Sequence, residues 1–135
     1  MKIMAIDYGD ARTGVAVSND SAALVGDAWV IQSRAANDVA STIIEEATKR
    51  NIGRIIVGYP KNMDGTTGER AEKCEQFAEL LRSLCETEVL LWDERLTTVS
   101  ANRVLTEAGK FGKKRKKSID AVAASLILES YLGSL

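Results

Sequence analysis

The sequence contains no histidine, and its two cysteines do not have the spacing of a metal-binding pair. Cys74 and Cys85 lie 11 positions apart in one predicted helix, which separates them by about 16 Å at 1.5 Å per residue. Because a disulfide requires a separation of under about 7 Å, we expect two free thiols in the core. Without histidine, the usual zinc sites and the Ser-His and Cys-His nucleophiles are excluded. Any chemistry must come from carboxylates, Lys, Arg, Tyr and the backbone.

Long hydrophobic runs are also missing. The longest nearly apolar run, residues 121–128, is interrupted by Ser125 and is far shorter than the roughly 18 residues of a membrane span. Lys2 is followed by only four apolar residues before Asp7, which does not resemble a signal peptide. We therefore expect a cytoplasmic protein without membrane association, folded as a single domain over residues 1–135.

Charge of one sign is not in excess, since the net charge is −1, but the basic residues are unevenly distributed. A basic block holds six of the 18 basic residues and leaves 12 basic against 19 acidic residues elsewhere. Such a block is either a local anion-binding surface or a solvated loop. Its members are Lys110, Lys113, Lys114, Arg115, Lys116 and Lys117.

Apolar runs without polar alternation predict three strands that are buried on both faces. Two further strands pair with the first as an antiparallel meander. With helices between the later strands, this order predicts an α/β fold with a mixed five-stranded sheet, an antiparallel three-strand meander plus two parallel strands, flanked by helices. The predicted strands are Ile3–Ile6, Thr13–Ser18, Asp27–Gln32, Arg54–Gly58 and Val89–Trp92.

Four helices are predicted from apolar periodicity and from residues that favour helix ends. The first has Asn37 as its N-cap and stops at Gly53, and the second begins at the Thr-x-x-Glu capping box that ends at Glu69 and carries both cysteines. A short third helix is capped by Thr97 or Thr98 and closed by Gly109, and the last one, Asp120–Leu132, is capped by Ser118.

Carboxylates follow two of the three buried strands, at Asp7 and at Asp93-Glu94, and the third strand ends in the turn Gly58-Tyr59-Pro60. Ligands of open α/β sheets gather at the carboxyl ends of the strands, so these residues are expected at one edge. Asp7 has a second interpretation, as a turn-initiating Asp that bonds its own backbone.

Asp120 opens the last helix, where an acid ordinarily complements the helix dipole. It also belongs to an otherwise apolar stripe of positions 123, 124, 127, 128 and 131, which points it toward the sheet. Converging buried carboxylates repel one another unless a cation neutralises them. Oxygen ligands select Mg²⁺ or Mn²⁺, and such clusters usually serve phosphoryl transfer.

The segments Asp7-Tyr8-Gly9, Val57-Gly58-Tyr59-Pro60, Asp93-Glu94-Arg95-Leu96-Thr97-Thr98 and residues 118–124 together resemble the YqgF/RuvX family. The likeness covers Ile3 to Leu132. It implies a single RNase H-like domain and a metal-dependent nuclease. Family members are described as Holliday junction resolvases and as nucleases that mature the 5′ end of pre-16S rRNA.

The resemblance implies that Asp7, Glu94 and Asp120 are the catalytic acids and the metal ligands. It selects Glu94 over Asp93, which strand geometry alone leaves open. Two ions about 4 Å apart would activate a water and stabilise the leaving oxygen, and without histidine the metal-bound hydroxide replaces a general base. Tyr59 departs from the pattern, which usually has Leu there, without affecting these assignments.

Nucleic acid is the expected partner, as precursor rRNA or as branched DNA. Candidate contacts are Arg12, Arg95 and, from the basic block, Lys113, Lys114, Arg115, Lys116 and Lys117. Arg95 has a second interpretation as a salt-bridge partner of the acids. The chain is expected to be a monomer or a homodimer, since symmetric cleavage of a four-way junction requires a dimer.

Two other functions are compatible with parts of the sequence. The Asp-x-Gly hairpin also resembles the phosphate-binding strand of sugar kinases and actin-like ATPases, but these enclose their nucleotide between two such domains. A nucleic-acid-binding module that lost its chemistry is the other alternative, although buried carboxylates that repel phosphate would not benefit a pure binder.

Overall fold

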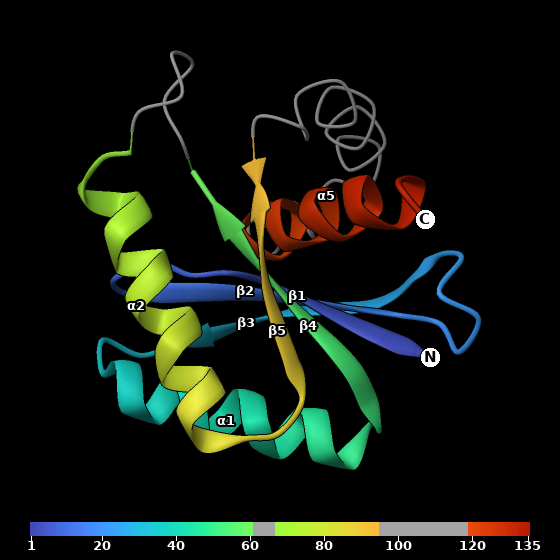
Figure 1. Cartoon of the computed structure of the whole chain (residues 1–135), viewed down its shortest axis with the longest axis horizontal. Helices are drawn as coiled ribbons and strands as arrows, with labels where there is room; N and C mark the ends of the chain where they lie inside the picture. The colour runs from blue at the N-terminus through green and yellow to red at the C-terminus, as the bar shows by residue number, and fades with distance from the viewer. Residues whose placement is uncertain (61–66, 95–118) are drawn as a thin grey trace.

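The computed structural model describes residues 1–60, 67–94 and 119–135, with side chains in the last range described from residue 121 (Figure 1). Its five strands form one sheet in the order β3-β2-β1-β4-β5, which confirms the predicted mixed sheet. The strands are β1 (Lys2–Asp7), β2 (Arg12–Ser18), β3 (Val25–Gln32), β4 (Ile52–Tyr59) and β5 (Glu88–Asp93).

The strands pair in the predicted directions, as an antiparallel meander to which two parallel strands are added. β2 is antiparallel to both β1 and β3, whereas β4 is parallel to β1 and β5 is parallel to β4. Asp7 lies opposite Gly14 at one end of the β1–β2 ladder, and Tyr59 lies opposite Asp93 at the corresponding end of the β4–β5 ladder. The carboxyl ends of β1, β4 and β5 therefore share one edge of the sheet.

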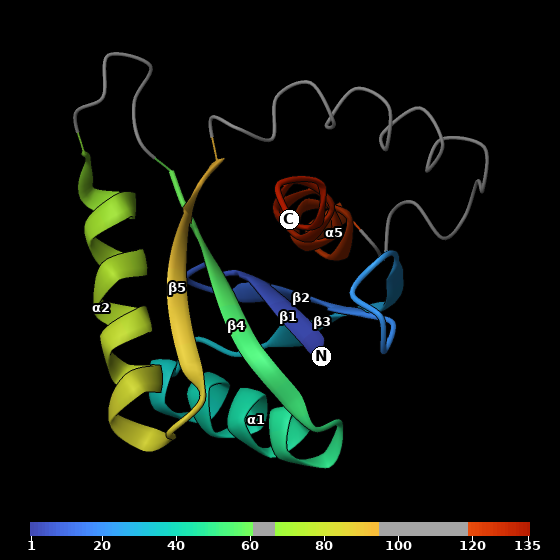
Figure 2. The same cartoon turned by 45° about the vertical axis from the view of Figure 1, so that its right-hand side comes forward.

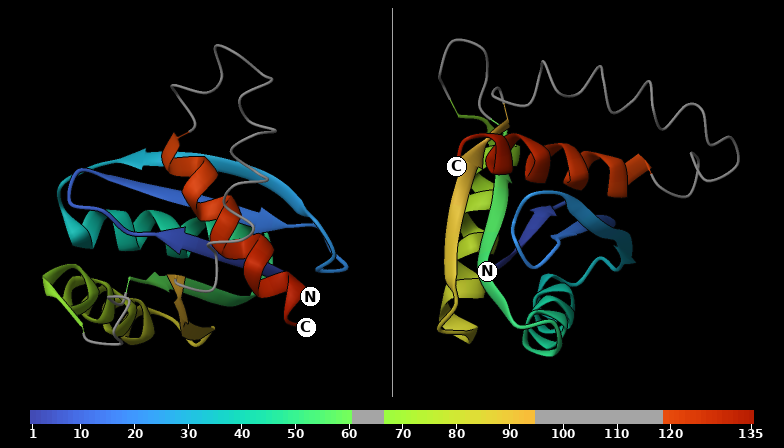
Figure 3. Two further views of the ribbon diagram at one scale, coloured as in Figure 1. Left: turned by 90° about the horizontal axis from the view of Figure 1, so that it is seen from above. Right: turned by 90° about the vertical axis from the view of Figure 1, so that its right-hand side faces the viewer.

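Helices cover the two faces unequally (Figures 2 and 3). α1 (Ala36–Lys49) and α2 (Glu69–Leu84) pack on one face, and α5 (Ile119–Gly133) is the helix on the other face among the described residues. Seen from above, α5 crosses the meander strands obliquely (Figure 3). β1 and β4 are consequently buried on both sides, as their unalternating apolar runs predicted, whereas β5 lies at the edge of the sheet and is only partly buried after Val89.

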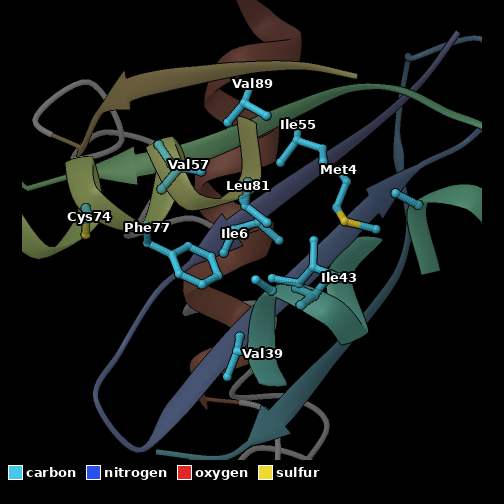
Figure 4. Close-up of a cluster of buried hydrophobic side chains, with 14 of the residues drawn as sticks. Met4, Ile6, Val39, Ile43, Ile55, Val57, Cys74, Phe77, Leu81 and Val89 are labelled. Carbon is cyan, nitrogen blue, oxygen red and sulfur yellow. The ribbon is translucent and has the colours of Figure 1, made fainter. Parts of the chain in front are cut away.

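Each face has its own hydrophobic core, because neighbouring strand residues point in opposite directions. The core under α1 and α2 is the larger one, and Figure 4 shows Met4 and Ile6 of β1 meeting Ile43 of α1 and Leu81 of α2. The core under α5 is built on Ile3, Ala5, Ala16 and Ile56 from the sheet and on Ala124, Ile127, Leu128 and Tyr131 from the helix.

The predicted helix caps were wrong at three ends. α1 begins after Ala35 instead of at Asn37, and α2 begins after Gly68, in both cases without a capping side-chain hydrogen bond. α1 ends at Lys49, with Arg50 as its C-cap, because Asn51 adopts a left-handed conformation with φ 57°, two residues before the predicted stop at Gly53. Ser118 and the predicted helix over 97–109 lie outside the described residues.

Both cysteines are free, as their spacing predicted. Cys74 is buried inside α2, and Cys85 follows the end of that helix. Burial and the nearby charge of Glu94 raise the pKa of the Cys74 thiol to about 12, so this sulfur stays protonated and inert. Within the described ranges, no helix combines the length and the apolar character needed to cross a membrane.

Candidate active site

Asp7 and Glu94 meet at the carboxyl edge of the sheet, on the face covered by α5. Asp7 ends β1 and lies on the same face of the strand as Ile3 and Ala5, which both belong to the α5 core. Glu94 follows β5 directly, and its carboxyl group and that of Asp7 are hydrogen-bonded. Two acids that are 87 residues apart in the sequence therefore form one site.

Gly58 of β4 makes this meeting possible, because β4 lies between β1 and β5. A Cβ atom at Gly58 would lie 2.8 Å from Oε1 of Glu94 and 2.6 Å from Cδ1 of Ile127. The Glu94 side chain thus lies directly over the bare backbone of Gly58, with α5 packed beside it. A side chain at position 58 would separate Glu94 from Asp7.

The two carboxyl groups are strongly coupled. Burial, and next the charge of Asp7, raise the pKa of Glu94 to about 7 from its ordinary value of 4.5. The protonated Glu94 carboxyl then donates its hydrogen bond to the Asp7 carboxylate, whose side chain is only 13% exposed. A half-buried acid held near neutrality by a second acid is a common property of functional sites.

The turn after Asp7 depends on glycine. A Cβ atom at Gly9 would lie 2.4 Å from the carbonyl oxygen of Arg12, which is closer than any real contact. The chain must reverse here because β2 returns alongside β1, with Gly14 opposite Asp7. Gly9 thereby fixes the position of Asp7 at the strand end.

Arg70 is a site residue that the sequence prediction missed. It is the second residue of α2, and its Nη2 atom lies 3.2 Å from Oδ1 of Asp7. α2 follows β4, so its first turn returns to the carboxyl edge where the acids lie. A cation in the first turn opposes the helix dipole. That unfavourable placement was the available signal that Arg70 has a partner outside its own helix.

A cavity of about 370 Å³ lies beside this ion pair, between the first turns of α2 and the turn that follows Asp7. Lys73 crosses it, with Nζ 3.1 Å from Oδ1 of Asp10 and 3.6 Å from Oε1 of Glu69. The ring of Tyr8 stacks on Phe77 with centroids 4.1 Å apart. The lining residues are Tyr8, Gly9, Asp10, Glu69, Arg70 and Lys73.

The other predicted site residues are only partly described. Asp120 is the second residue of α5, the helix on the Asp7 face, and its side chain lies outside the described part of the structure. Arg12 is exposed at the first position of β2. Arg95, Lys113, Lys114, Arg115, Lys116 and Lys117 lie outside the described residues.

Two neighbours of the acids point away from the site. Tyr59 donates a hydrogen bond to Oε1 of Glu75 at 2.5 Å, on the α2 side of the sheet. Asp93 pairs with Tyr59 in the sheet. It points to the face opposite to that of its neighbour Trp92, which packs under α5. The unusual Tyr59 is thus directed away from the α5 face, where Asp7 and Glu94 meet.

The donor set suits a hard divalent cation. Asp7 and Glu94 offer carboxylate oxygens, and the raised pKa of Glu94 and the ion pair of Asp7 with Arg70 both indicate negative charge that a cation would neutralise. Among the described side chains no group of three acids, thiols or imidazoles surrounds one point, so a further ligand must come from elsewhere in the chain. Asp120 is the predicted one.

The profile of the RuvX family, described as Holliday junction resolvase, matches residues 1–134. This chain belongs to the RuvX family. The predicted YqgF/RuvX resemblance is therefore confirmed.

Relatives within this family are close. A protein of Halothermothrix orenii is 47% identical over 98% of this chain and 94% of its own length, and one of Bacillus cytotoxicus is 40% identical over 99% of both. Both bear the name "Putative pre-16S rRNA nuclease".

Solved structures confirm the RNase H-like fold. RuvC of T. thermophilus, solved in complex with a Holliday junction substrate, superposes with a TM-score of 0.73 at 11% identity, over 99% of this chain and 94% of the other. The fowlpox virus resolvase, in complex with Holliday junction DNA, gives a TM-score of 0.64 at 12% identity, over 99% and 98%. At this identity the likeness concerns the fold alone.

Proposed function

We propose that this RuvX-family chain is a divalent-metal-dependent endonuclease that processes the 5′ end of pre-16S rRNA in the cytoplasm. The observation that carries this proposal is the contact between Asp7 and Glu94. The two acids meet over the bare backbone of Gly58, and the pKa of Glu94 is held near 7. The names of the relatives favour rRNA as the substrate. The family match over residues 1–134 favours a nuclease over the ATPase alternative.

Asp7, Glu94 and Asp120 would hold Mg²⁺ or Mn²⁺, in two ions as for other nucleases with clustered acids. When bound, such ions supply an ionised water and neutralise the charge that develops on the leaving oxygen. The protein side chains orient the site: Gly58 leaves room for Glu94, and Gly9 fixes Asp7. Glu94 must give up its proton before it can act as a ligand.

Substrate contacts are proposed for Arg12, Arg95 and the basic block, residues 113–117. The block precedes Asp120 by only a few residues in the sequence, which supports a role for its charges beside the proposed site. This arrangement would hold a phosphodiester backbone beside the site where it is cut.

The decisive experiment compares two substrates side by side. Purified protein with Mg²⁺ or Mn²⁺ is incubated with a pre-16S rRNA 5′ fragment and with a synthetic four-way DNA junction. We expect cleavage of the rRNA fragment, abolished in Asp7→Asn because that change removes a ligand charge at nearly constant volume. Asp7→Asn should retain or raise the melting temperature of the metal-free protein, since it relieves repulsion with Glu94.

Junction cleavage is the alternative outcome, favoured by the description of the family as Holliday junction resolvase. It would require a homodimer for symmetric cuts, which sedimentation of the protein with and without junction measures. Binding of either substrate without any cleavage would instead identify a non-catalytic module. Wild-type cleavage by Asp7→Asn would remove Asp7 from the site.

A further inference from the structure

The two side chains of the ion pair between Arg70 and Asp7 differ in their exposure to solvent. The Asp7 side chain is 13% exposed and the Arg70 side chain 62% exposed, so the guanidinium reaches the site from solvent. One terminal nitrogen engages one oxygen at 3.2 Å, and among the described residues the guanidinium has no second hydrogen-bond partner. Arg–carboxylate pairs are frequently bidentate, whereas this pair has a single contact and an exposed guanidinium.

Arg70 also lines the cavity that adjoins the candidate site. This cavity of about 370 Å³ opens beside Asp7, and Lys73 lies one turn further along the same helix. This side of the site is formed by α2, whereas α5 lies on the opposite face of the sheet (Figures 2 and 3). A phosphodiester held at Asp7 and Glu94 would therefore have the Arg70 guanidinium on its α2 side.

We infer that Arg70 is a substrate-binding residue whose partner changes during the reaction cycle. Before the cation binds, its guanidinium neutralises Asp7; once Asp7 is a metal ligand, the guanidinium binds a phosphate oxygen of the nucleic-acid strand in the adjacent cavity. This inference rests on the proposed nuclease function. Its chemistry is the fork of N–H donors that matches phosphate as well as it matches carboxylate.

The exchange is physically reasonable because the ion pair is exposed on the Arg70 side. An exposed pair contributes little stability, so its replacement by a divalent cation costs little. A flexible arginine at the second position of a helix can turn to a new acceptor without moving the backbone. Lys73 differs, because its partners Asp10 and Glu69 are not site acids and stay available to it.

The test uses Arg70→Gln, with Arg34→Gln as the matched control. Arg34 is exposed between β3 and α1, at the same edge of the sheet as Asp7, and among the described residues it forms no ion pair with Asp7 or Glu94, so it reports the loss of one nearby charge. Mn²⁺ binding is measured by calorimetry, and cleavage of the rRNA fragment and of the DNA junction is measured at several salt concentrations. Circular dichroism and the melting temperature establish that each variant is folded.

We expect opposite effects of Arg70→Gln on metal and on substrate. Mn²⁺ should bind with equal or roughly 2- to 5-fold higher affinity, because a competing cation is gone. The value of kcat/KM on the substrate that wild type cuts should fall about 10- to 100-fold, with a salt slope reduced by about one. Arg70→Lys should recover part of this loss, and Arg34→Gln should match wild type.

Three results would overturn the inference. Unchanged kcat/KM in Arg70→Gln would make Arg70 a counter-ion only. Weaker Mn²⁺ binding would mean that Arg70 orients Asp7 for the metal. An equal loss in Arg34→Gln would reduce the effect to general charge. Failure of the proposed function is recognised separately, because wild type itself would then neither bind Mn²⁺ nor cut either substrate.

Discussion

Gly58 is the residue on which the geometry of the site depends. The atoms that a new Cβ would meet are the far ends of two side chains, Oε1 of Glu94 and Cδ1 of Ile127. Since side-chain ends can move, Gly58→Ala should cost only about 1 kcal/mol of stability. Glu94 must leave its position over β4, however, and we expect cleavage to fall by about 100-fold or more, as for loss of a group that positions the reaction.

Denaturant unfolding and single-turnover cleavage measure these two effects separately. Gly133→Ala is the control, because a Cβ there meets no atom within 4 Å. A Gly58→Ala protein with wild-type cleavage would show that Glu94 does not need its place over the glycine.

Glu94 gives the metal-free protein a specific dependence on pH. Its pKa in the folded state is about 7, above the ordinary 4.5, so the folded state binds this proton more tightly. The associated stability is fully present below about pH 4.5 and is lost as the pH rises through 7. We expect a loss of about 2 kcal/mol between pH 5 and pH 8, allowing for partial solvent screening.

Urea unfolding in the presence of a chelator measures this loss, and the chain has no histidine whose titration would mask it. Glu94→Gln should flatten the profile, because its amide cannot titrate. Parallel profiles for the variant and for wild type would contradict the assignment. At limiting Mg²⁺, cleavage should rise with pH through the same range, since the ion must displace the Glu94 proton.

The two acids at the core of the site followed from the sequence, and Arg70 did not. Asp7 and Glu94 end strands that are recognisable as buried runs, and the family resemblance chose Glu94 over Asp93. Arg70 lies on a helix surface, where a charged residue is expected in any case. Only the spatial return of α2 to the carboxyl edge distinguishes it from other exposed arginines.

At the scale of elements, α5 is fastened to the sheet by polar contacts at its far end. Tyr131 accepts a hydrogen bond from Nη1 of Arg54 at 2.5 Å, and Ser130 accepts one from the Trp92 indole at 3.1 Å. The rings of Trp92 and Tyr131 meet edge to face with centroids 5.2 Å apart. These contacts fix the helix that carries Asp120.

Tyr131→Phe tests this attachment. The ring stays, but the partly buried Arg54 guanidinium loses an acceptor, and we expect a cost of about 1 kcal/mol. Unfolding by urea gives the value, and Ser134→Ala near the end of the same helix provides a comparison with an exposed position. Equal stability of Tyr131→Phe and wild type would mean that water replaces the hydroxyl without loss.

Strands were predicted more accurately than helix ends. Runs such as Ile3–Ile6 and Ile55–Val57 are apolar at every position because both faces of the sheet are covered there, and this signal is strong. Helix ends depend on single residues, and Asn51 ended α1 through its backbone conformation where Gly53 had been expected. Asn37 and Thr66 carry suitable capping side chains, but the chain enters each helix at other residues, Ala35 and Gly68.

For the whole molecule, we predict that the basic block serves binding and that the acids serve chemistry. Substituting Gln at Lys113, Lys114, Arg115, Lys116 and Lys117 together should weaken nucleic-acid binding and flatten its salt dependence, by about one unit of slope for each phosphate that is no longer neutralised. Cleavage of pre-bound substrate should survive, since Asp7 and Glu94 are untouched.

Filter binding across a salt series, with single-turnover cleavage at saturating protein, measures the two properties. Replacement of Lys49 and Lys2, both outside the site, gives the effect of reduced net charge alone. Unchanged affinity and slope in the five-residue variant would make the basic block a solvated surface.

The single domain over residues 1–135 and the cytoplasmic location stay predictions.

The unequal covering of the sheet has a consequence for biosynthesis. Chains are made from the N-terminus, and all five strands and both helices of the larger core precede residue 95. Until α5 leaves the ribosome, Ile3, Ala5, Ala16 and Ile56 lack the helix that covers them in the described part of the structure, and this apolar sheet face is open to chaperones and to other nascent chains. The helix that ends this exposure also delivers Asp120. Under the proposed function, a nascent chain that still lacks α5 would lack one of the three acids, and would not cut the RNA of the ribosome that is making it.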